Sequence, residues 1–161
     1  MGQQTYSSAA TSINSTKLPA VYSRVLPIAK GKTIIDYGCG RYPDIIRQAA
    51  QDVGASWYGY DRYNYQGDTL PASADIVVCA NVLNVIDSDA AVMDVLQAIA
   101  GYMRGNSVAY IAIYEGDKSG IGKPTKADCY QRNARAKAYV DMCKRVFGDV
   151  TPKDNVLICG L

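Results

Sequence analysis

Short, continuous apolar runs alternate with amphipathic segments along this sequence, and this alternation constrains the fold more than any other feature. The runs predict strands at 33–36, 55–61, 74–80, 107–115 and 154–161. Strands that are apolar along their whole length are typical of a parallel sheet with both faces covered by helices. The sequence therefore predicts an α/β fold, doubly wound and mostly parallel, with a ligand crevice at the carboxyl ends of the strands.

Helical spacing of apolar residues fills the intervals between the predicted strands. It occurs at 17–30, 43–54 and 87–105, and around 131–146. Residues 62–73, after the second strand, are rich in turn formers and lack this spacing. We therefore expect a compact fold in which the region after the second strand is shortened to a loop.

Size and composition indicate one domain of ordinary globular type. The chain has 161 residues, of which 48% are hydrophobic, and a net charge of +2. We expect a flexible polar tail over 1–16, without the apolar core of a secretory signal, and a single cofactor-binding domain over 17–161. No apolar run is long enough to span a membrane, and the small charge does not favour a nucleic-acid partner. Oligomeric state is not predicted.

The sequence contains five cysteines without C-x-x-C spacing and no histidine. We therefore expect reduced thiols in a cytoplasmic protein, and no metal site. Without histidine, Ser-His-Asp and Cys-His catalysis are excluded, and a general base has to be a carboxylate, Tyr, Lys, Cys or water.

A glycine turn, D-Y-G-C-G at 36–40, follows the first predicted strand. Its two glycines allow a tight turn and a close approach to a ligand. The pattern lacks the G-x-x-x-x-G-K-[ST] of a phosphate-binding Walker loop, which is therefore excluded. A dinucleotide loop of the form G-x-G-x-x-G would need a third glycine where Pro43 stands, so an NAD site is disfavoured.

Acidic residues stand at the ends of the first two strands, and the first of them discriminates between the remaining ligands. Asp36 would repel a pyrophosphate and attract an ammonium group, such as that of the methionine part of S-adenosylmethionine. Asp61 is placed to accept hydrogen bonds from both hydroxyls of a ribose. An acid such as Asp61 is common to nucleotide and S-adenosylmethionine sites, so Asp36 and the glycine turn are what favour S-adenosylmethionine as the cofactor.

The motifs IIDYGCG, WYGYD and ADIVVCANVLNVI resemble, in this order, the cofactor motifs of class I S-adenosylmethionine-dependent methyltransferases. The likeness covers about residues 32–114 and implies a Rossmann-like methyltransferase fold. It implies that the glycine turn passes under the cofactor, Asp36 meets its amino acid end, Asp61 holds the ribose, and Arg62 and Tyr63 flank the adenine. The implied cofactor-binding residues are Asp36, Gly38, Cys39, Gly40, Asp61, Arg62, Tyr63, Ala80 and Asn81.

A narrower likeness links YGYDRYN, NVLNVID and GKPTKADCYQRN to methyltransferases associated with DNA phosphorothioation systems. Two departures from the class I pattern limit what the class I resemblance implies for this sequence. The helix and strand that usually follow the second strand are missing or very short, so Asp68 is either the adenine contact or a turn residue. No N-P-P-Y tetrapeptide follows 74–80, which argues against amino methylation of adenine or cytosine in nucleic acid.

Methyl transfer needs alignment of the acceptor with the methyl group, and a base only where the acceptor carries a proton. The candidates at the strand ends are Asn81, Asn84, Tyr114, Glu115 and Asp117, with Glu115 preferred as base or substrate orienter. Asn84 could equally cap the helix that follows. The basic segment 122–137 is either a lid and anion contact or a solvated face. The sequence thus predicts a methyltransferase acting on a small molecule or a modified nucleotide. The alternative is a cofactor-binding protein without transfer activity, serving as a regulator or partner subunit.

Overall fold

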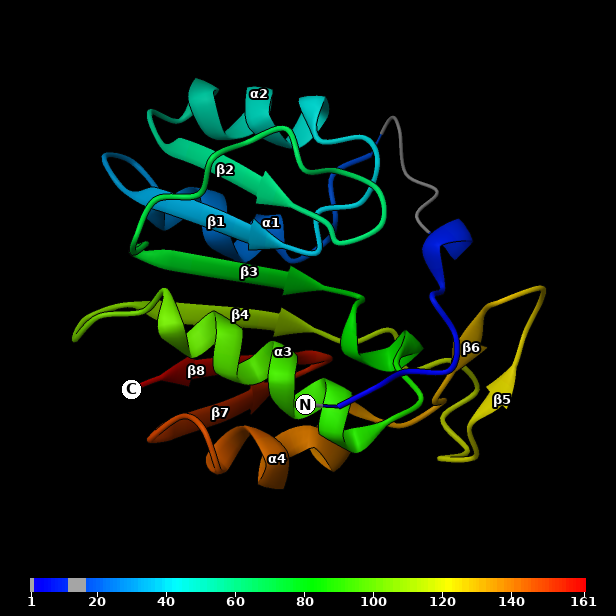
Figure 1. Cartoon of the computed structure of the whole chain (residues 1–161). Coiled ribbons are helices and arrows are strands. Elements are labelled where there is room, and N and C mark those ends of the chain that lie inside the picture. The colour runs from blue at the N-terminus through cyan, green and yellow to red at the C-terminus, as the bar shows by residue number, and fades with distance from the viewer. Residues whose placement is uncertain (1, 12–16) are drawn as a thin grey trace.

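A six-stranded sheet forms the centre of the computed structural model, which describes residues 2–11 and 17–161 (Figure 1). Its order is β2-β1-β3-β4-β8-β7, with β1 to β4 parallel and β8 antiparallel to both of its neighbours. The strands are β1 (Thr33–Tyr37), β2 (Ser56–Tyr60), β3 (Ile76–Ala80), β4 (Val108–Ala112), β7 (Asp149–Lys153) and β8 (Val156–Gly160). The predicted fold class, a mostly parallel α/β sheet, is confirmed.

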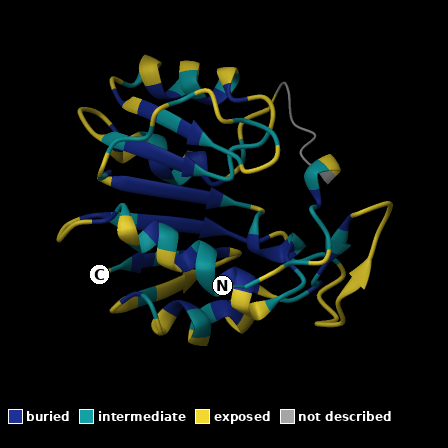
Figure 2. Cartoon of the chain, in the orientation of Figure 1, coloured by how far each residue is buried: buried dark blue, intermediate teal, exposed yellow. Residues whose placement is uncertain are grey.

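Helices cover both faces of this sheet (Figure 1). The short α1 (Tyr22–Val25) and α2 (Asp44–Asp52) pack on one face, and α3 (Asp89–Gly101) and α4 (Val140–Lys144) pack on the other. The central strands are buried along their length, while the outer helix surfaces are exposed (Figure 2). Successive residues of each central strand point to opposite faces of the sheet, so they pack alternately into two hydrophobic cores, one on each face.

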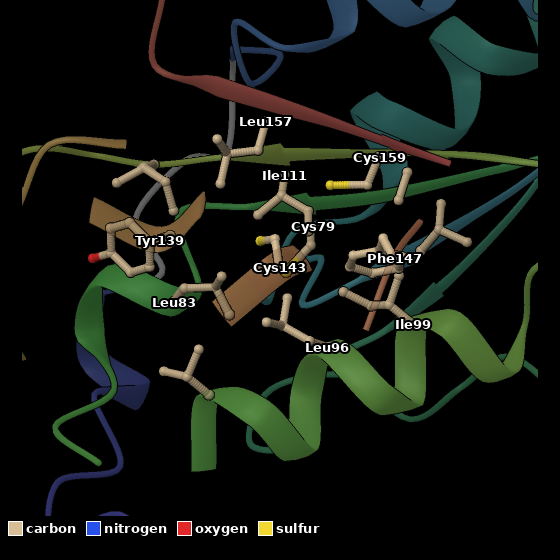
Figure 3. Packing of buried hydrophobic residues seen from close by; sticks show 14 of the residues in the cluster. Cys79, Leu83, Leu96, Ile99, Ile111, Tyr139, Cys143, Phe147, Leu157 and Cys159 are labelled. Carbon is tan, nitrogen blue, oxygen red and sulfur yellow. The ribbon is translucent and has the colours of Figure 1, made fainter. Parts of the chain in front are cut away.

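The larger core lies between the sheet and α3 with α4. Leu96 and Ile99 of α3 face Ile111 of β4, and Phe147 and Cys143 close the cluster from the side of α4 (Figure 3). All five are at most 1% exposed. This packing holds α3 against the strands whose carboxyl ends carry the candidate site.

A two-stranded hairpin, β5 (Lys123–Pro124) and β6 (Tyr130–Gln131), projects beside the carboxyl ends of the main sheet (Figure 1). Four single-turn 3₁₀ segments complete the described chain. They are η1 (Ala9–Thr11), η2 (Leu26–Ile28), η3 (Leu83–Val85) and η4 (Ala136–Tyr139).

The prediction of one helix around 131–146 is wrong. After β6 the chain has no helical turn until Arg135, which is extended, and it then forms η4 and the short α4. Asn133 has a left-handed φ of 59°, and its side-chain amide donates to the carbonyl of Ile121 at 3.0 Å. Tertiary hydrogen bonds therefore override the helical spacing of this segment.

Strand β7 is not predicted by the sequence, because an exposed edge strand with a proline carries no apolar run. It forms because a turn at Asp154 (φ 55°) returns the chain antiparallel onto β8. The predicted helix at 17–30 is shortened to α1 and η2. Within the described residues, no helix has the length and apolar character that crossing a membrane requires.

Part of the predicted N-terminal tail lies against the domain. Residues 2–11 run along the carboxyl edge of the sheet, with Ser8 only 4% exposed (Figure 1). Met1 and residues 12–16 lie outside the described residues. The flexibility of the tail, and the assignment of 17–161 as a single domain, stay predictions.

Candidate functional site

A cavity of about 860 Å³ opens at the carboxyl ends of β1, β2 and β3. This is within the usual size range of small-molecule sites. Every residue predicted to bind the cofactor lines it. These are Asp36, Gly38, Cys39, Gly40, Asp61, Arg62, Tyr63, Ala80 and Asn81.

The glycine turn is built against the turn that follows β3. Gly38 has a φ of 100°, and a Cβ added to it would lie 2.3 Å from Cγ2 of Val82. The backbone N–H groups of Gly38 and Cys39 both donate to the carbonyl of Tyr60, at 2.6 and 3.0 Å. Glycine is therefore required at position 38 by its backbone conformation and by the close approach of Val82.

Asp36 is buried at the end of β1 with one carboxylate oxygen engaged and one free. The hydroxyl of Tyr22 donates to Oδ2 at 2.5 Å, and Nε1 of Trp57 donates to that hydroxyl at 2.9 Å. Oδ1 is buried and has no hydrogen-bond partner among the described residues. A buried, unpaired carboxylate oxygen is costly, so this position is suited to a ligand that brings a donor or a positive charge.

Electrostatics at Asp36 support the same interpretation. Burial raises the pKa of its carboxyl from 3.8 to about 7; the hydrogen bond from Tyr22 opposes this shift, and the charge of Asp61 adds to it. A cation placed at Oδ1 would lower the pKa again, because it favours the ionised form. The geometry and charge of the site therefore fit the ammonium group of S-adenosylmethionine.

Asp61 ties the loop after β2 to the glycine turn. Its Oδ2 accepts from the N–H of Gly40 at 2.9 Å, and its Oδ1 accepts from the N–H groups of Tyr63 and Asn64 at 3.0 Å. Oδ1 also accepts from Nδ2 of Asn64 at 3.3 Å, whereas Oδ2 has the N–H of Gly40 as its one partner among the described residues, so a ribose hydroxyl can be added at Oδ2. Arg62 stacks over the ring of Tyr63 at 5.3 Å, on the same lip of the cavity.

Asp68 has a structural position outside this cavity. It pairs with Arg47 at 2.9 Å, accepts from the hydroxyl of Tyr65 at 2.8 Å, and accepts from the N–H of Gly59 at 2.9 Å. These contacts fold the loop over β2, one of the two edge strands of the sheet, and satisfy the N–H group of Gly59 in that strand. The turn interpretation of Asp68 therefore describes its place better than an adenine contact does.

The structure separates the predicted catalytic residues. Asn81 lines the cavity, with a left-handed φ of 60° that turns the chain away from β3. Tyr114 is 59% exposed, and Glu115 lines a different, smaller cavity of about 280 Å³. Oε2 of Glu115 accepts from the N–H of Ala136 at 2.7 Å, so this carboxylate anchors the start of η4 and lies outside the cofactor cavity.

Asn84, a second strand-end asparagine, is buried and structural. Its Oδ1 accepts from the N–H of Tyr114 at 3.3 Å, which links η3 to the end of β4. The cap of α3 is Ser88, whose Oγ accepts from the N–H of Ala91 at 3.2 Å.

Several residues of the site are not predicted by the sequence. Tyr22 and Trp57 support Asp36 from α1 and β2, and Asp94 lines the cavity from α3. Tyr22 and Trp57 look like ordinary core residues in the sequence, because aromatic side chains at buried positions carry no signal of a polar role. Asp94 has a sequence signal, a carboxylate between the apolar positions of an amphipathic helix.

No protein-family profile and no curated protein matches the sequence significantly. Solved structures with similar folds are S-adenosylmethionine-dependent methyltransferases. The mitomycin 7-O-methyltransferase MmcR is 18% identical, with a TM-score of 0.54 over 81% of this chain. The Burkholderia thailandensis 1,6-didemethyltoxoflavin-N1-methyltransferase, solved with its substrate and S-adenosylhomocysteine, is 15% identical, with a TM-score of 0.58 over 88% of this chain and 77% of its own.

A methyltransferase from Mesorhizobium loti is 11% identical, with a TM-score of 0.57 over 85% of this chain and 93% of its own. The chain spans about half the length of MmcR, 48%. At these identities the likeness shows the fold alone. The chain has the Rossmann-like fold of the S-adenosylmethionine-dependent methyltransferases.

Proposed function

We propose that this chain binds S-adenosylmethionine in the cavity at the ends of β1 to β3 and transfers its methyl group to a small molecule or a modified nucleotide. The observation that carries the proposal is the buried Oδ1 of Asp36, which has no partner among the described residues and belongs to a residue that lines this cavity. The narrower likeness to phosphorothioation-associated methyltransferases, which would favour a modified nucleotide, stays a prediction. So does the cytoplasmic location.

Bound S-adenosylmethionine would supply a methyl group on a positively charged sulfur, already activated for displacement. Asp36 would pair with its ammonium group, the turn 38–40 would lie against its chain, and Asp61 would accept from its ribose. Asn81 would orient the acceptor, because it lines the cavity at the end of β3. The residues therefore act by positioning, which contributes most to a reaction with an activated donor.

Tyr37 and Cys39 of the glycine turn are poor bases at neutral pH. Burial raises the pKa of Tyr37 to about 12 and raises the pKa of the Cys39 thiol well above its usual range. A group that holds its proton at pH 7 cannot accept one from the acceptor. Tyr37 and Cys39 are therefore not proposed as the base; the carboxylates that line the cavity besides Asp36 are Asp61 and Asp94.

Calorimetric titration tests the cofactor. S-Adenosylmethionine and S-adenosylhomocysteine are expected to bind, since both carry the ammonium group and the ribose, and NAD is not. If neither of the first two ligands binds, the proposal is wrong.

The alternative, a cofactor-binding protein without transfer activity, has one observation in its favour: Glu115 and Tyr114 lie outside the cofactor cavity. Incubation with methyl-labelled S-adenosylmethionine and fractionated extracts separates the two functions. A labelled product in the small-molecule or nucleotide fraction supports the methyltransferase. Binding without a labelled product in the small-molecule, nucleic-acid and protein fractions supports the alternative.

A further inference from the structure

Residues 2–11, called the strap below, cross the carboxyl edge of the sheet between the loops after β1 and β2 and the β5–β6 hairpin (Figure 1). Gln3, Gln4 and Ser7 line the same cavity as the predicted cofactor-binding residues. The strap therefore forms one wall of the candidate site.

The first residues of the strap are held at and just before α3. The N–H of Gly2 donates to Oδ2 of Asp94 at 2.5 Å, and the N–H of Thr5 donates to Oδ1 of Asp87 at 2.9 Å.

The middle of the strap is held by the hairpin. The side chain of Asp128 accepts from the N–H of Ser7 at 3.1 Å and from its hydroxyl, and the carbonyl of Asp128 accepts from the N–H of Ser8 at 2.8 Å. The ring of Tyr6 stacks on the ring of Tyr130, with centroids 5.4 Å apart and planes 17° apart. Asp128 thus anchors two consecutive strap residues.

Ser8 connects the strap to the segment that follows Asn81. Its hydroxyl donates to the carbonyl of Val85 at 3.0 Å, and its Oγ accepts from the N–H of Tyr130 at 3.2 Å. It keeps a left-handed φ of 53°, which is unfavourable for a residue with a Cβ. These contacts are what hold the strained residue in place.

On the opposite lip, Ala9 meets the two loops that build the cofactor half of the cavity. Its carbonyl accepts from Nη2 of Arg41 at 3.0 Å and from Nδ2 of Asn64 at 3.3 Å. Arg41 directly follows the glycine turn, and Asn64 lies in the loop organised by Asp61. The strap therefore bridges the two lips of the cavity.

We propose that the strap is a closing element: it covers bound ligand when docked and has to leave the hairpin for ligand to enter or leave. Asp128 is the hairpin residue that holds it there, beside the contacts at its two ends. The bonds that Asp128 makes to Ser7 are solvent-exposed, and such bonds contribute little each, so undocking is far cheaper than global unfolding. The basic segment 122–137 then serves mainly to carry the anchor of the strap. The identity of the covered ligand rests on the proposed function.

Cys39 provides a test that needs no ligand. It lines the cavity and is half-buried, whereas the other four cysteines are buried. The rate at which N-ethylmaleimide modifies the Cys39 peptide of the native protein, followed by mass spectrometry, reports opening of the strap. Asp128→Ala is expected to raise this rate about tenfold, since two bonds to a carboxylate are lost. Tyr6→Ala, which leaves the hairpin intact, is expected to raise it in the same direction.

Asp117→Ala is the matched control, because Asp117 is an exposed aspartate of the neighbouring loop. Among the described residues, its side chain accepts from Ser119 of its own turn and has no bond to the strap. It is expected to leave the rate unchanged. An unchanged rate in both Asp128→Ala and Tyr6→Ala overturns the strap proposal. So does faster labelling in all three variants, since it reports general loosening.

Adding S-adenosylhomocysteine separates the two proposals. Two results together support both the strap and the proposed cofactor. The ligand slows labelling of Cys39 in the wild type, and it dissociates about tenfold faster from Asp128→Ala than from the wild type. If the variants accelerate labelling but the ligand gives no protection in the wild type, the strap stands and the proposed cofactor is wrong. If the ligand protects Cys39 yet dissociates equally fast from wild type and Asp128→Ala, the closing role is overturned.

Discussion

Asp36 is placed to bind a ligand, but its burial lowers the stability of the folded protein when the carboxyl is ionised. Its carboxyl has a pKa of about 7 in the folded chain against 3.8 unfolded, because burial disfavours the charged form. Between these two values the folded state holds a proton that the unfolded state has released. The contribution of Asp36 to the unfolding free energy is therefore fully present below pH 4. As the pH rises toward 7, this contribution falls by roughly 4 kcal/mol.

Asp36→Asn removes this titration. We expect the wild-type protein without ligand to lose unfolding free energy between about pH 4 and pH 7, and the variant to lose clearly less over the same range. Urea denaturation at closely spaced pH values measures the difference. Parallel pH profiles for the two proteins would show that Asp36 is ionised in the folded chain without such a cost.

Tyr22 controls the ionisation of Asp36, since its hydroxyl donates to Oδ2 and favours the charged form. An ammonium ligand binds the ionised carboxylate, so the affinity for S-adenosylhomocysteine should fall as the pH drops below about 7. In Tyr22→Phe the pKa of Asp36 rises further, and the midpoint of this fall should move to higher pH. Calorimetry across pH 5.5 to 9 measures the midpoint for each protein. Trp57→Phe leaves the hydrogen bond from Tyr22 to Asp36 in place, so it should shift the midpoint less than Tyr22→Phe does.

At the scale of elements, the turn after β1 depends on the turn after β3. Gly38→Ala places a Cβ 2.3 Å from Val82 and forces an alanine to a φ of 100°. We expect a loss of about 2–4 kcal/mol in unfolding free energy and loss of ligand binding. Gly101→Ala is the control, because a Cβ at the last residue of α3 meets nothing within 4 Å, and it should be neutral or slightly stabilising.

Elements with a local cause are well predicted by the sequence. β1, β3 and β4 are short apolar runs, and α3 has a serine cap and an apolar stripe, so each is found near its predicted position. β7 and the broken segment 131–146 have non-local causes: pairing with β8 in the first case, and hydrogen bonds of Asn133 in the second. The spacing of apolar residues along the sequence does not predict contacts with such distant partners.

The candidate site divides in the same way. The cofactor side follows from Asp36, the glycine turn and Asp61, which stand at strand ends and so meet at one edge of a parallel sheet. Glu115 also follows a strand directly, but its side chain is bound by Ala136 and lies outside this cavity. The strap is invisible to sequence analysis, because a polar segment docks through a few scattered hydrogen bonds.

At the scale of the whole molecule, the two cores share the same strands. Ile34 and Ile35 are neighbours in β1 and pack into opposite cores, as do Ile76 and Val77 in β3. If these strands separate, the apolar residues of both cores become exposed to solvent together. We therefore expect residues 17–161 to unfold as one cooperative unit, with equal calorimetric and van't Hoff enthalpies.

Ligand linkage sharpens this prediction. The cavity joins loops from three strands with α3, so a ligand that binds it is bound only by the fully folded chain. S-Adenosylhomocysteine at 100 times its dissociation constant should raise the unfolding free energy by about 2.7 kcal/mol, and should move the single transition as a whole. Scanning calorimetry with and without ligand measures this. Two separated transitions, of which only one moves with ligand, would show that the strands of the site and those near β7 unfold independently, and would contradict a single domain.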